Sequence, residues 1–366
     1  MKRTMIWFLG TLLILASCAP NMEEETSQKT DNEQEVSVLS SQSSKETYRM
    51  IAPYKTNVAR GLITNQISNR VDIDEIEEGL KHHSQDVFDP SELYFQEGQY
   101  LTEDIILSWI TDLNPAREDD WDVETHRKNP RIFSHVLEHN YLRQVGDKEV
   151  ELAGISIGIA LKSVYHFRVP VNGDPYSEEI EMNAMLEKGY EVAQVVLENM
   201  RETEGLSDIP FMFTLYREED PYSPVPGNFV AKTSVPGGSN SIEDWETINE
   251  EHILFPSSEG EKKYPEEHEI LKHFGNEIAQ YFPNYVGIVG DGFYVDEELQ
   301  SLKIEIPIEA SGKTELIGFM QYAYGLVQDV YENYYELEIN ITSGGKVVGL
   351  IYREAGGDSP EVHVIH

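Results

Sequence analysis

The sequence predicts an α+β protein in which two related strand–helix–strand units follow an N-terminal mixed region. One observation is a set of letters that recurs at constant spacing: Tyr190, Gln194, Val196, Glu198 and Asn199 return as Tyr324, Gln328, Val330, Glu332 and Asn333. A strand-like segment ending in proline precedes each set, at residues 165–170 and 302–307. Strands and helices alternate too rarely for a doubly wound sheet, which favours α+β over α/β.

The N-terminal mixed region spans residues 51–146. We expect a helix at 72–80, a strand or a helix at 101–110, and a polar loop at 112–128. After Pro130, residues 129–141 have the spacing of another helix.

The two repeat units are predicted at residues 147–258 and 259–366. In the second, apolar and charged side chains alternate at 302–308, as in a half-buried strand, and residues 337–341 before Ser343-Gly344-Gly345 indicate a hairpin. The first unit is expected to contain a strand at 211–216. Chance identity is the alternative explanation for the repeated letters.

The composition limits the possible partners. The chain has 28 basic and 66 acidic side chains and a formal net charge of −38. Nucleic acids and anionic lipids require a basic face, so neither is expected to bind the folded part. The acidity is typical of a soluble, self-repelling surface. No motif predicts a cofactor, and a single cysteine excludes an intramolecular disulfide.

The first 17 residues have the features of a lipoprotein signal peptide. Lys2 and Arg3 precede an apolar run that is too short to span a bilayer, and Leu15-Ala16-Ser17-Cys18 has the form of a lipobox. We expect cleavage between Ser17 and Cys18 by signal peptidase II, after a diacylglyceryl transferase has modified the Cys18 sulfur. Two acyl chains, such as palmitate, hold a protein stably on a membrane, whereas one does not. The alternative is an ordinary secretory signal with a coincidental cysteine.

Residues 18–50 are rich in Glu, Ser, Thr, Gln and Asn and carry few large apolar side chains. Such a segment cannot bury enough surface to offset its ordering entropy, so we expect an acidic, disordered tether. The folded part would then be held at the extracytoplasmic face of the cell membrane.

A possible catalytic motif is His135-Val136-Leu137-Glu138-His139, which matches the H-x-x-E-H pattern of inverted zinc peptidases. On a helix the two histidines would share one face and could bind a metal, with Glu138 as the base. This gives an alternative function, an extracytoplasmic metal-dependent hydrolase. The sequence nominates no third ligand, and a solvated helix explains the pattern as well, so we predict no metal site and no catalytic residue.

The lipobox, the acidic tether and several short segments together resemble the CamS family of Gram-positive bacteria, the precursors of a staphylococcal sex pheromone. The segments are Arg60-Gly61-Leu62, Asn69, Asp72-Ile73, Glu78-Gly79-Leu80, residues 94–101 and Arg353-Glu354-Ala355-Gly356. The resemblance covers essentially the whole chain and implies a repeated unit in the folded part.

The resemblance also implies that the named activity resides in the discarded signal peptide. Its last seven residues are released as an apolar pheromone in the staphylococcal members, and here they are Thr11, Leu12, Leu13, Ile14, Leu15, Ala16 and Ser17. Thr11 and Leu12 depart from the staphylococcal peptide. The mature domain is then expected to be a non-enzymatic surface or binding module of unknown ligand.

Overall fold

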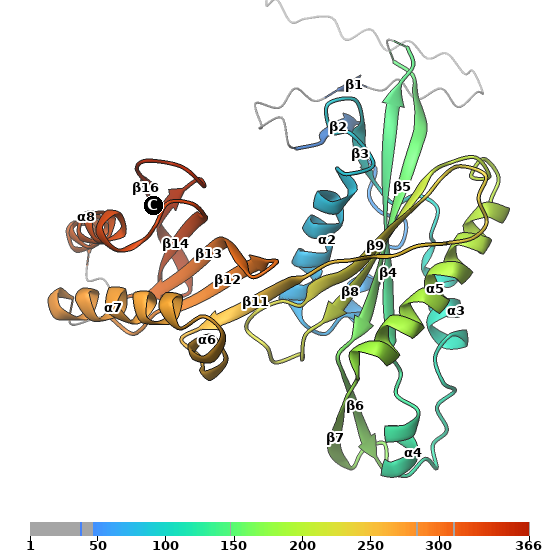
Figure 1. Cartoon of the computed structure of the whole chain (residues 1–366), viewed down its shortest axis with the longest axis horizontal. Coiled ribbons are helices and arrows are strands. Elements are labelled where there is room, and N and C mark those ends of the chain that lie inside the picture. The colour runs from blue at the N-terminus through green and yellow to red at the C-terminus, as the bar shows by residue number, and fades with distance from the viewer. Residues whose placement is uncertain (1–36, 39–46, 147, 283–284, 310–311, 366) are drawn as a thin grey trace, which may run out of the picture. The chain divides into compact units, whose positions relative to one another are not determined.

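The computed structural model describes residues 37–38, 47–146, 148–282, 285–309 and 312–365. An eight-stranded sheet forms the first part (Figure 1). Its strands, in spatial order, are β1 (Ser37–Val38), β2 (Arg49–Ala52), β3 (Tyr94–Glu97), β4 (Phe133–Gln144), β5 (Val150–Lys162), β8 (Phe211–Glu218), β9 (Asn228–Val235) and β10 (Glu246–Thr247).

Helices pack on both faces of this sheet. Helix α2 (Arg70–Ser84) packs with α1 (Ile63–Gln66) on one face, where Ile76 and Leu80 contact Leu137 of β4 and Tyr216 of β8. On the other face, α3 (Glu103–Asp112) and α5 (Met182–Glu202) cover the isoleucines of β5. The short helix α4 (Val123–Lys128) and the hairpin of β6 (Val164–Val169) and β7 (Asp174–Glu179) complete this part.

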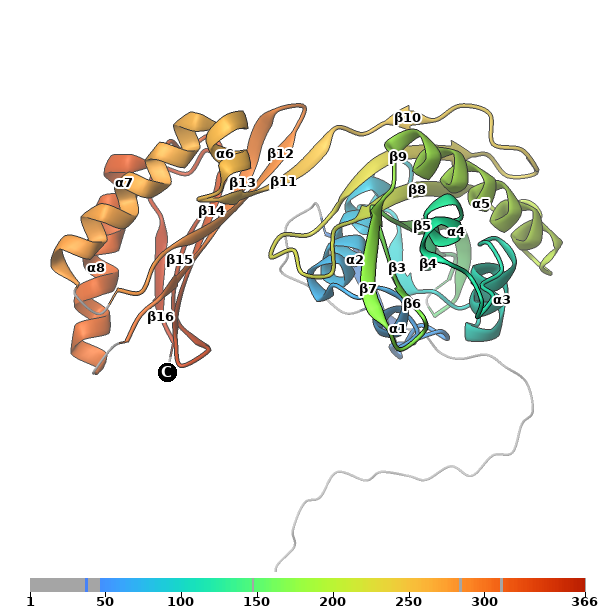
Figure 2. The same ribbon diagram turned by 90° about the horizontal axis from the view of Figure 1, so that it is seen from below.

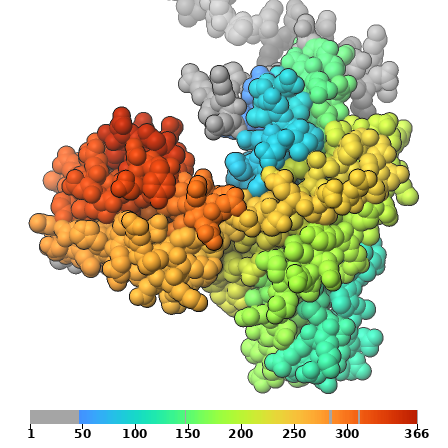
Figure 3. Space-filling model, viewed as in Figure 1, coloured from blue at the N-terminus to red at the C-terminus, as the bar shows by residue number. Residues whose placement is uncertain are grey.

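The second part is a six-stranded sheet with helices on one face (Figure 2). Its strands are β11 (Glu250–Phe255), β12 (Val289–Val295), β13 (Glu298–Pro307), β14 (Glu336–Ser343), β15 (Lys346–Arg353) and β16 (Glu361–Val364). Helices α7 (Pro265–Tyr281) and α8 (Lys313–Val330) bury apolar side chains against it, and α6 (Ser258–Lys263) precedes α7. In the space-filling view, α6 and α7 form much of the visible surface of this part, in light orange (Figure 3).

The local sequence explains helix α2, which positions one wall of the site described below. The Asn69 side chain accepts a hydrogen bond from the Val71 N–H and so caps the helix, and Asp72 lies in its first turn. Ile76 and Leu80 are spaced four residues apart and are fully buried against the sheet. Lys81, His82 and His83 in the last turn complement the helix dipole.

The α+β class is confirmed, and both sheets contain parallel crossovers through helices, with β2 and β3 of the first sheet paired in parallel around α1 and α2. In the first, β5 pairs in parallel with β8 and α5 lies between them in sequence; in the second, β13 and β14 pair in parallel around α8. The predicted hairpin after α8 is confirmed as β14 and β15. The strand at 165–170, however, does not begin the crossover through α5, because β6 pairs only with β7. The tandem repeat remains a prediction.

Several expected elements differ in the structure. Residues 129–141 do not form a helix but contribute to strand β4, in which Phe133 to Leu142 are all buried. Because β4 is covered on both faces, its burial has no period from which a strand could be distinguished. The loop at 112–128 contains α4, and residues 37–38 and 49–50 of the predicted tether lie in strands β1 and β2. The boundary at 146 falls in the β4–β5 hairpin, so one sheet spans both regions.

Candidate functional site

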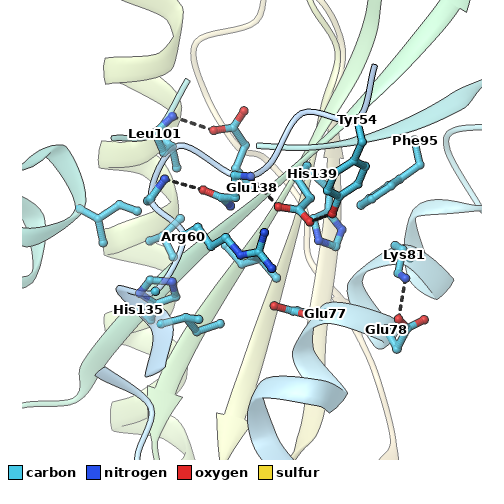
Figure 4. A pocket seen from close by; sticks show the side chains of 18 of the residues that line it. Tyr54, Arg60, Glu77, Glu78, Lys81, Phe95, Leu101, His135, Glu138 and His139 are labelled. Atoms are coloured by element: carbon cyan, nitrogen blue, oxygen red, sulfur yellow. Dashed lines mark hydrogen bonds and ion pairs between the residues drawn. The ribbon is translucent and has the colours of Figure 1, made fainter. Parts of the chain in front are cut away.

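A cavity of about 300 Å³ lies beside strand β4 in the eight-stranded sheet (Figure 4). The loop before α1 contributes Tyr54, Asn57, Ala59 and Arg60, and α2 contributes Glu77, Glu78 and Lys81. Strand β3 adds Phe95 and Glu97, and β4 adds residues 135–139. The cavity thus brings together segments that are more than 80 positions apart in the sequence, from Met50 to His139.

Strand β4 is paired on one side only over most of the length that borders the cavity. Strand β5 pairs with β4 from Phe133 to Gln144, but β3 ends at Glu97, opposite His139. The Phe133 N–H and C=O are instead bonded by the Asn114 side chain, at 3.1 and 2.8 Å. Alternate residues of an antiparallel strand direct their backbone groups away from the partner. Residues 134–138 therefore have backbone groups on this side that no described strand uses.

Glu138 holds the segment that follows β3. Its carboxylate accepts hydrogen bonds from the backbone N–H groups of Gln99 (2.9 Å), Tyr100 (3.0 Å) and Leu101 (2.7 Å). A Cβ at Gly98 would lie 2.7 Å from the Glu138 Cβ, so only glycine permits this close approach. We call residues 98–101 the strap. Burial raises the pKa of Glu138, and the three backbone bonds oppose that shift.

His135 and His139 are buried without hydrogen bonds. They are 2% and 3% exposed, and neither imidazole has a hydrogen-bond partner among the described residues. The His139 ring meets the Phe95 ring edge to face, with centroids 4.8 Å apart. Burial lowers the pKa of each histidine to about 3, so both rings are neutral at pH 7. The Nδ1 atom of each ring is buried without a hydrogen-bond partner, and an unsatisfied buried group costs about 1–3 kcal/mol.

The geometry argues against the zinc-hydrolase hypothesis. His135 and His139 lie on a strand rather than a helix, and four residues along a strand span roughly 13 Å. A zinc ion needs its nitrogen ligands about 2.0–2.1 Å away, so one ion cannot reach both without rearrangement. Strand alternation places Glu138 on the other face, where it binds the strap. Within the described part of the chain, no group of three or more His, Cys, Asp or Glu side chains could hold a metal ion.

The charged groups at the cavity are mostly paired. Lys81 forms an ion pair with Glu78 at 2.6 Å, and Glu97 accepts hydrogen bonds from the Tyr54 hydroxyl and the Asn57 N–H. Arg60 is different: its side chain is drawn among the groups that line the cavity in Figure 4. Among the described residues, the Arg60 guanidinium has no ion pair or hydrogen bond, although its backbone N–H donates to the Asn57 carbonyl.

Glu77 is the remaining carboxylate at this cavity. It makes no ion pair within the described residues, and burial together with the nearby Glu97 charge raises its pKa. The cavity therefore offers one guanidinium, two neutral imidazoles and an apolar wall that includes Phe95, Leu101 and Ile106. This arrangement is suited to binding a small polar ligand and lacks a nucleophile paired with a base.

The predicted lipidation and peptide residues lie outside the described residues. These are Cys18, the cleavage position after Ser17, and residues 11–17. In the described ranges, no helix is both long enough and apolar enough to cross a bilayer.

Comparison with known proteins gives the family. The profile of the family described as "CamS sex pheromone cAM373 precursor" matches residues 54–359. The chain belongs to the CamS family. None of the curated proteins gives a significant match to the sequence.

Two solved structures share the CamS fold seen here. A crystal structure of a sex pheromone precursor from Lactobacillus salivarius subsp. salivarius is 25% identical, with a TM-score of 0.83 over 90% of this chain and 99% of that one. The C-terminal domain of the sex pheromone staph-cAM373 precursor from Staphylococcus aureus is 24% identical, with a TM-score of 0.71 over 83% of this chain and 99% of that one.

The segments that carry the CamS resemblance have two structural roles. Some border the cavity: Arg60, Gly61, Glu78, Phe95, Glu97 and Leu101. Others fix the fold. Asp72 accepts hydrogen bonds from the Tyr216 hydroxyl (2.8 Å) and the Gly227 N–H (2.6 Å), which joins α2 to β8 and β9. Near the end of the chain, the Arg353 guanidinium donates to the carbonyls of Tyr331 and Glu332, just after α8.

Sequence reasoning identified the histidines but not their setting. The roles of Arg60 and Glu77 were missed, because exposed charged residues are numerous in this chain and nothing local distinguishes these two. Only the pairing of β3 with β4 shows that their segments meet. A correct strand prediction for 133–144 would have removed the metal hypothesis.

Proposed function

We propose that this chain is the precursor of a lipoprotein anchored through Cys18 at the extracytoplasmic face of the cell membrane. The observation that carries the proposal is Leu15-Ala16-Ser17-Cys18, a lipobox that contains the chain's single cysteine, in a member of the CamS sex pheromone precursor family. A diacylglyceryl thioether supplies two acyl chains, enough for stable membrane residence. The diacylglyceryl transferase and signal peptidase II act during maturation.

We also propose that the discarded signal peptide releases a signalling peptide. Residues 11–17 would leave as an uncharged heptapeptide, Thr-Leu-Leu-Ile-Leu-Ala-Ser, whose apolar side chains suit partition into membranes and an apolar receptor pocket. The folded part would act as a non-enzymatic surface and binding module, with no cofactor. The cavity beside β4 supports binding, because it has unused polar groups but no nucleophile–base pair.

Mass spectrometry of the protein extracted from membranes tests the anchor. The expected N-terminus is Cys18 with a diacylglyceryl adduct, and the culture medium should contain the heptapeptide. A Cys18→Ser variant should appear in the aqueous fraction, whereas Ser27→Ala, a change in the neighbouring segment, should remain in the membrane. A free Cys18 thiol, or a mature N-terminus elsewhere, would refute the anchor.

The signalling role needs its own measurement. Synthetic Thr-Leu-Leu-Ile-Leu-Ala-Ser should provoke a mating response in plasmid-bearing recipients at concentrations where a scrambled peptide of the same composition does not. Equal responses to both peptides, or none across a broad recipient panel, would remove the signalling role and leave the anchor untouched.

A further inference from the structure

We propose that the cavity beside β4 binds a short extended peptide with a free C-terminal carboxylate, which adds to the open edge of β4 and pairs with Arg60. This inference deepens the proposed role of the folded part as a binding module and rests on it. The ligand class follows from three features of the cavity: the strand edge, the buried imidazoles and the free guanidinium.

The strand edge selects a ligand with a peptide backbone. Strand β3 ends at Glu97, so no described strand pairs with this edge of β4 at residues 134–137, while Gly98 of the strap packs against Glu138. Residues 134–137 are buried, yet their outward backbone groups have no strand partner there. Buried backbone N–H and C=O groups are nearly always paired, and an added strand supplies alternating donors and acceptors at the correct spacing. A fatty acid or a sugar does not.

The imidazoles and the apolar wall would contact the side chains of such a peptide. Successive side chains of a strand point to opposite faces, so a residue added beside β4 would meet either the face of His135, Leu137 and His139 or that of Val136. The two imidazoles, 2% and 3% exposed and without hydrogen bonds, can each donate or accept. A volume of about 300 Å³ is at the small end of ligand sites, which limits the peptide to roughly three residues.

The charges favour a single carboxylate on the ligand. Glu78 is neutralised by Lys81, and Glu97 is occupied by Tyr54 and Asn57, which leaves Arg60 as the unpaired cation. A guanidinium binds a carboxylate through two parallel hydrogen bonds. Glu77 also lines the cavity and would repel a second acidic group. Neutral tripeptides should therefore bind better than those with an Asp or Glu side chain.

Calorimetric titration of the full mature chain, extracted in detergent, with Ala-Leu-Ala tests the proposal. We expect saturable binding that weakens at least tenfold for the C-terminal amide of the same peptide and for an Arg60→Gln variant. Lys55→Gln is the matched control, since Lys55 is an exposed cation of the same loop that does not line the cavity. It should bind Ala-Leu-Ala as the unaltered protein does.

Hydrogen exchange then distinguishes strand addition from other modes of binding. Ala-Leu-Ala should slow exchange of amides in residues 134–138 and leave those of β14, in the other sheet, unchanged. Absence of binding at millimolar peptide, equal binding of the amide or by Arg60→Gln, or binding without protection of β4 would overturn the proposal. So would hexanoate, an acid without a peptide backbone, if it bound as tightly.

The same preparation separates this inference from the proposed function. Mass spectrometry of its N-terminus reports the lipid on Cys18 independently of peptide binding. If the protein is lipidated but does not bind Ala-Leu-Ala, only the peptide site is refuted. If it binds the peptide but has a free Cys18 thiol, only the anchor is refuted.

Discussion

The two sheets of this protein differ in how they are covered. The eight-stranded sheet has helices on both faces, and ten consecutive residues of β4 are buried. The six-stranded sheet is covered by helices on one face, and buried and more exposed residues alternate along β13 and β14. The first arrangement leaves no solvated face for polar side chains, whereas the second provides one at every other position.

This difference decides where polar groups are buried. Around the eight-stranded sheet the buried polar side chains include Asp72, His135, Glu138, His139, Ser156, Thr214 and Glu218. Among the described residues from 250 onward they are His268 and Arg353. Buried polar groups are retained at a cost in stability, and they concentrate around the sheet that carries the cavity.

A lysine placed in each sheet should show the largest contrast. Ser156 of β5 is fully buried and shares a 2.6 Å hydrogen bond with Ser84 of α2, so Ser156→Lys should lower the free energy of unfolding by about 3–5 kcal/mol. Asn340→Lys, on the open face of β14 next to Glu338, should change it by less than about 0.5 kcal/mol. Urea denaturation followed by circular dichroism measures both. Equal losses would mean that the coverage of the two sheets does not matter.

Asp72, which joins α2 to the eight-stranded sheet, should contribute to the pH dependence of stability. Burial raises the pKa of Asp72 to about 6, so the folded protein binds this proton at a higher pH than the unfolded chain does. Stability from this group is therefore present below the unfolded pKa, near 4, and is lost as the pH rises through about 6. The loss between pH 4 and 7 should be on the order of 2 kcal/mol.

Asp72→Asn should remove only the contribution of Asp72, about 2 kcal/mol between pH 4 and 7, because its amide oxygen can still accept from Tyr216 and Gly227. The contributions of the buried His135, His139 and Glu218 should remain. Asp74→Asn, which changes an exposed carboxyl on the same helix, is the control and should retain the dependence. Denaturation at a series of pH values gives both slopes. A wild-type slope in Asp72→Asn would assign the dependence to other groups, such as Glu218, whose pKa burial raises to about 7.

Two helix glycines provide the smallest contrast. A Cβ at Gly79 of α2 would lie 2.2 Å from the buried Phe229 ring, so Gly79→Ala should destabilise by about 1–2 kcal/mol after the gain in helix propensity. Gly318 of α8 has nothing within 4 Å of such an atom, and Gly318→Ala should stabilise by about 0.5–1 kcal/mol. Thermal unfolding of the two variants should shift in opposite directions. A stabilising Gly79→Ala would show that α2 is not packed as closely as described.

The difference in helix coverage between the two sheets also explains which strands could be predicted from the sequence. The strand at 302–308 and the hairpin at 337–345 were correctly predicted. A strand with one solvated face alternates apolar and polar residues, and this alternation is visible in the sequence. Helix α2 was predicted because its cap and apolar spacing are local. Strand β4 was wrongly predicted as a helix because burial on both faces removes the period, and the four-residue spacing of His135 and His139 suits either element.

The candidate site could not be derived from the sequence for a related reason. Its groups come from the loop before α1, from α2, from β3 and from β4, and only the sheet order brings them together. Arg60 is exposed and carries no distinguishing neighbour in sequence. The four residues of the lipobox, in contrast, are consecutive in the sequence. The motif could therefore be recognised without knowledge of the fold.

Attachment of the strap through main-chain amides affects how the cavity wall can diverge among relatives. The Glu138 carboxylate accepts hydrogen bonds from the backbone N–H groups of Gln99, Tyr100 and Leu101. Every amino acid except proline has such an N–H group. Replacements at Gln99 and Tyr100 therefore keep the bonds that hold Leu101, the strap residue that lines the cavity. The position of this part of the cavity wall thus depends on the main chain of the strap and on one carboxylate.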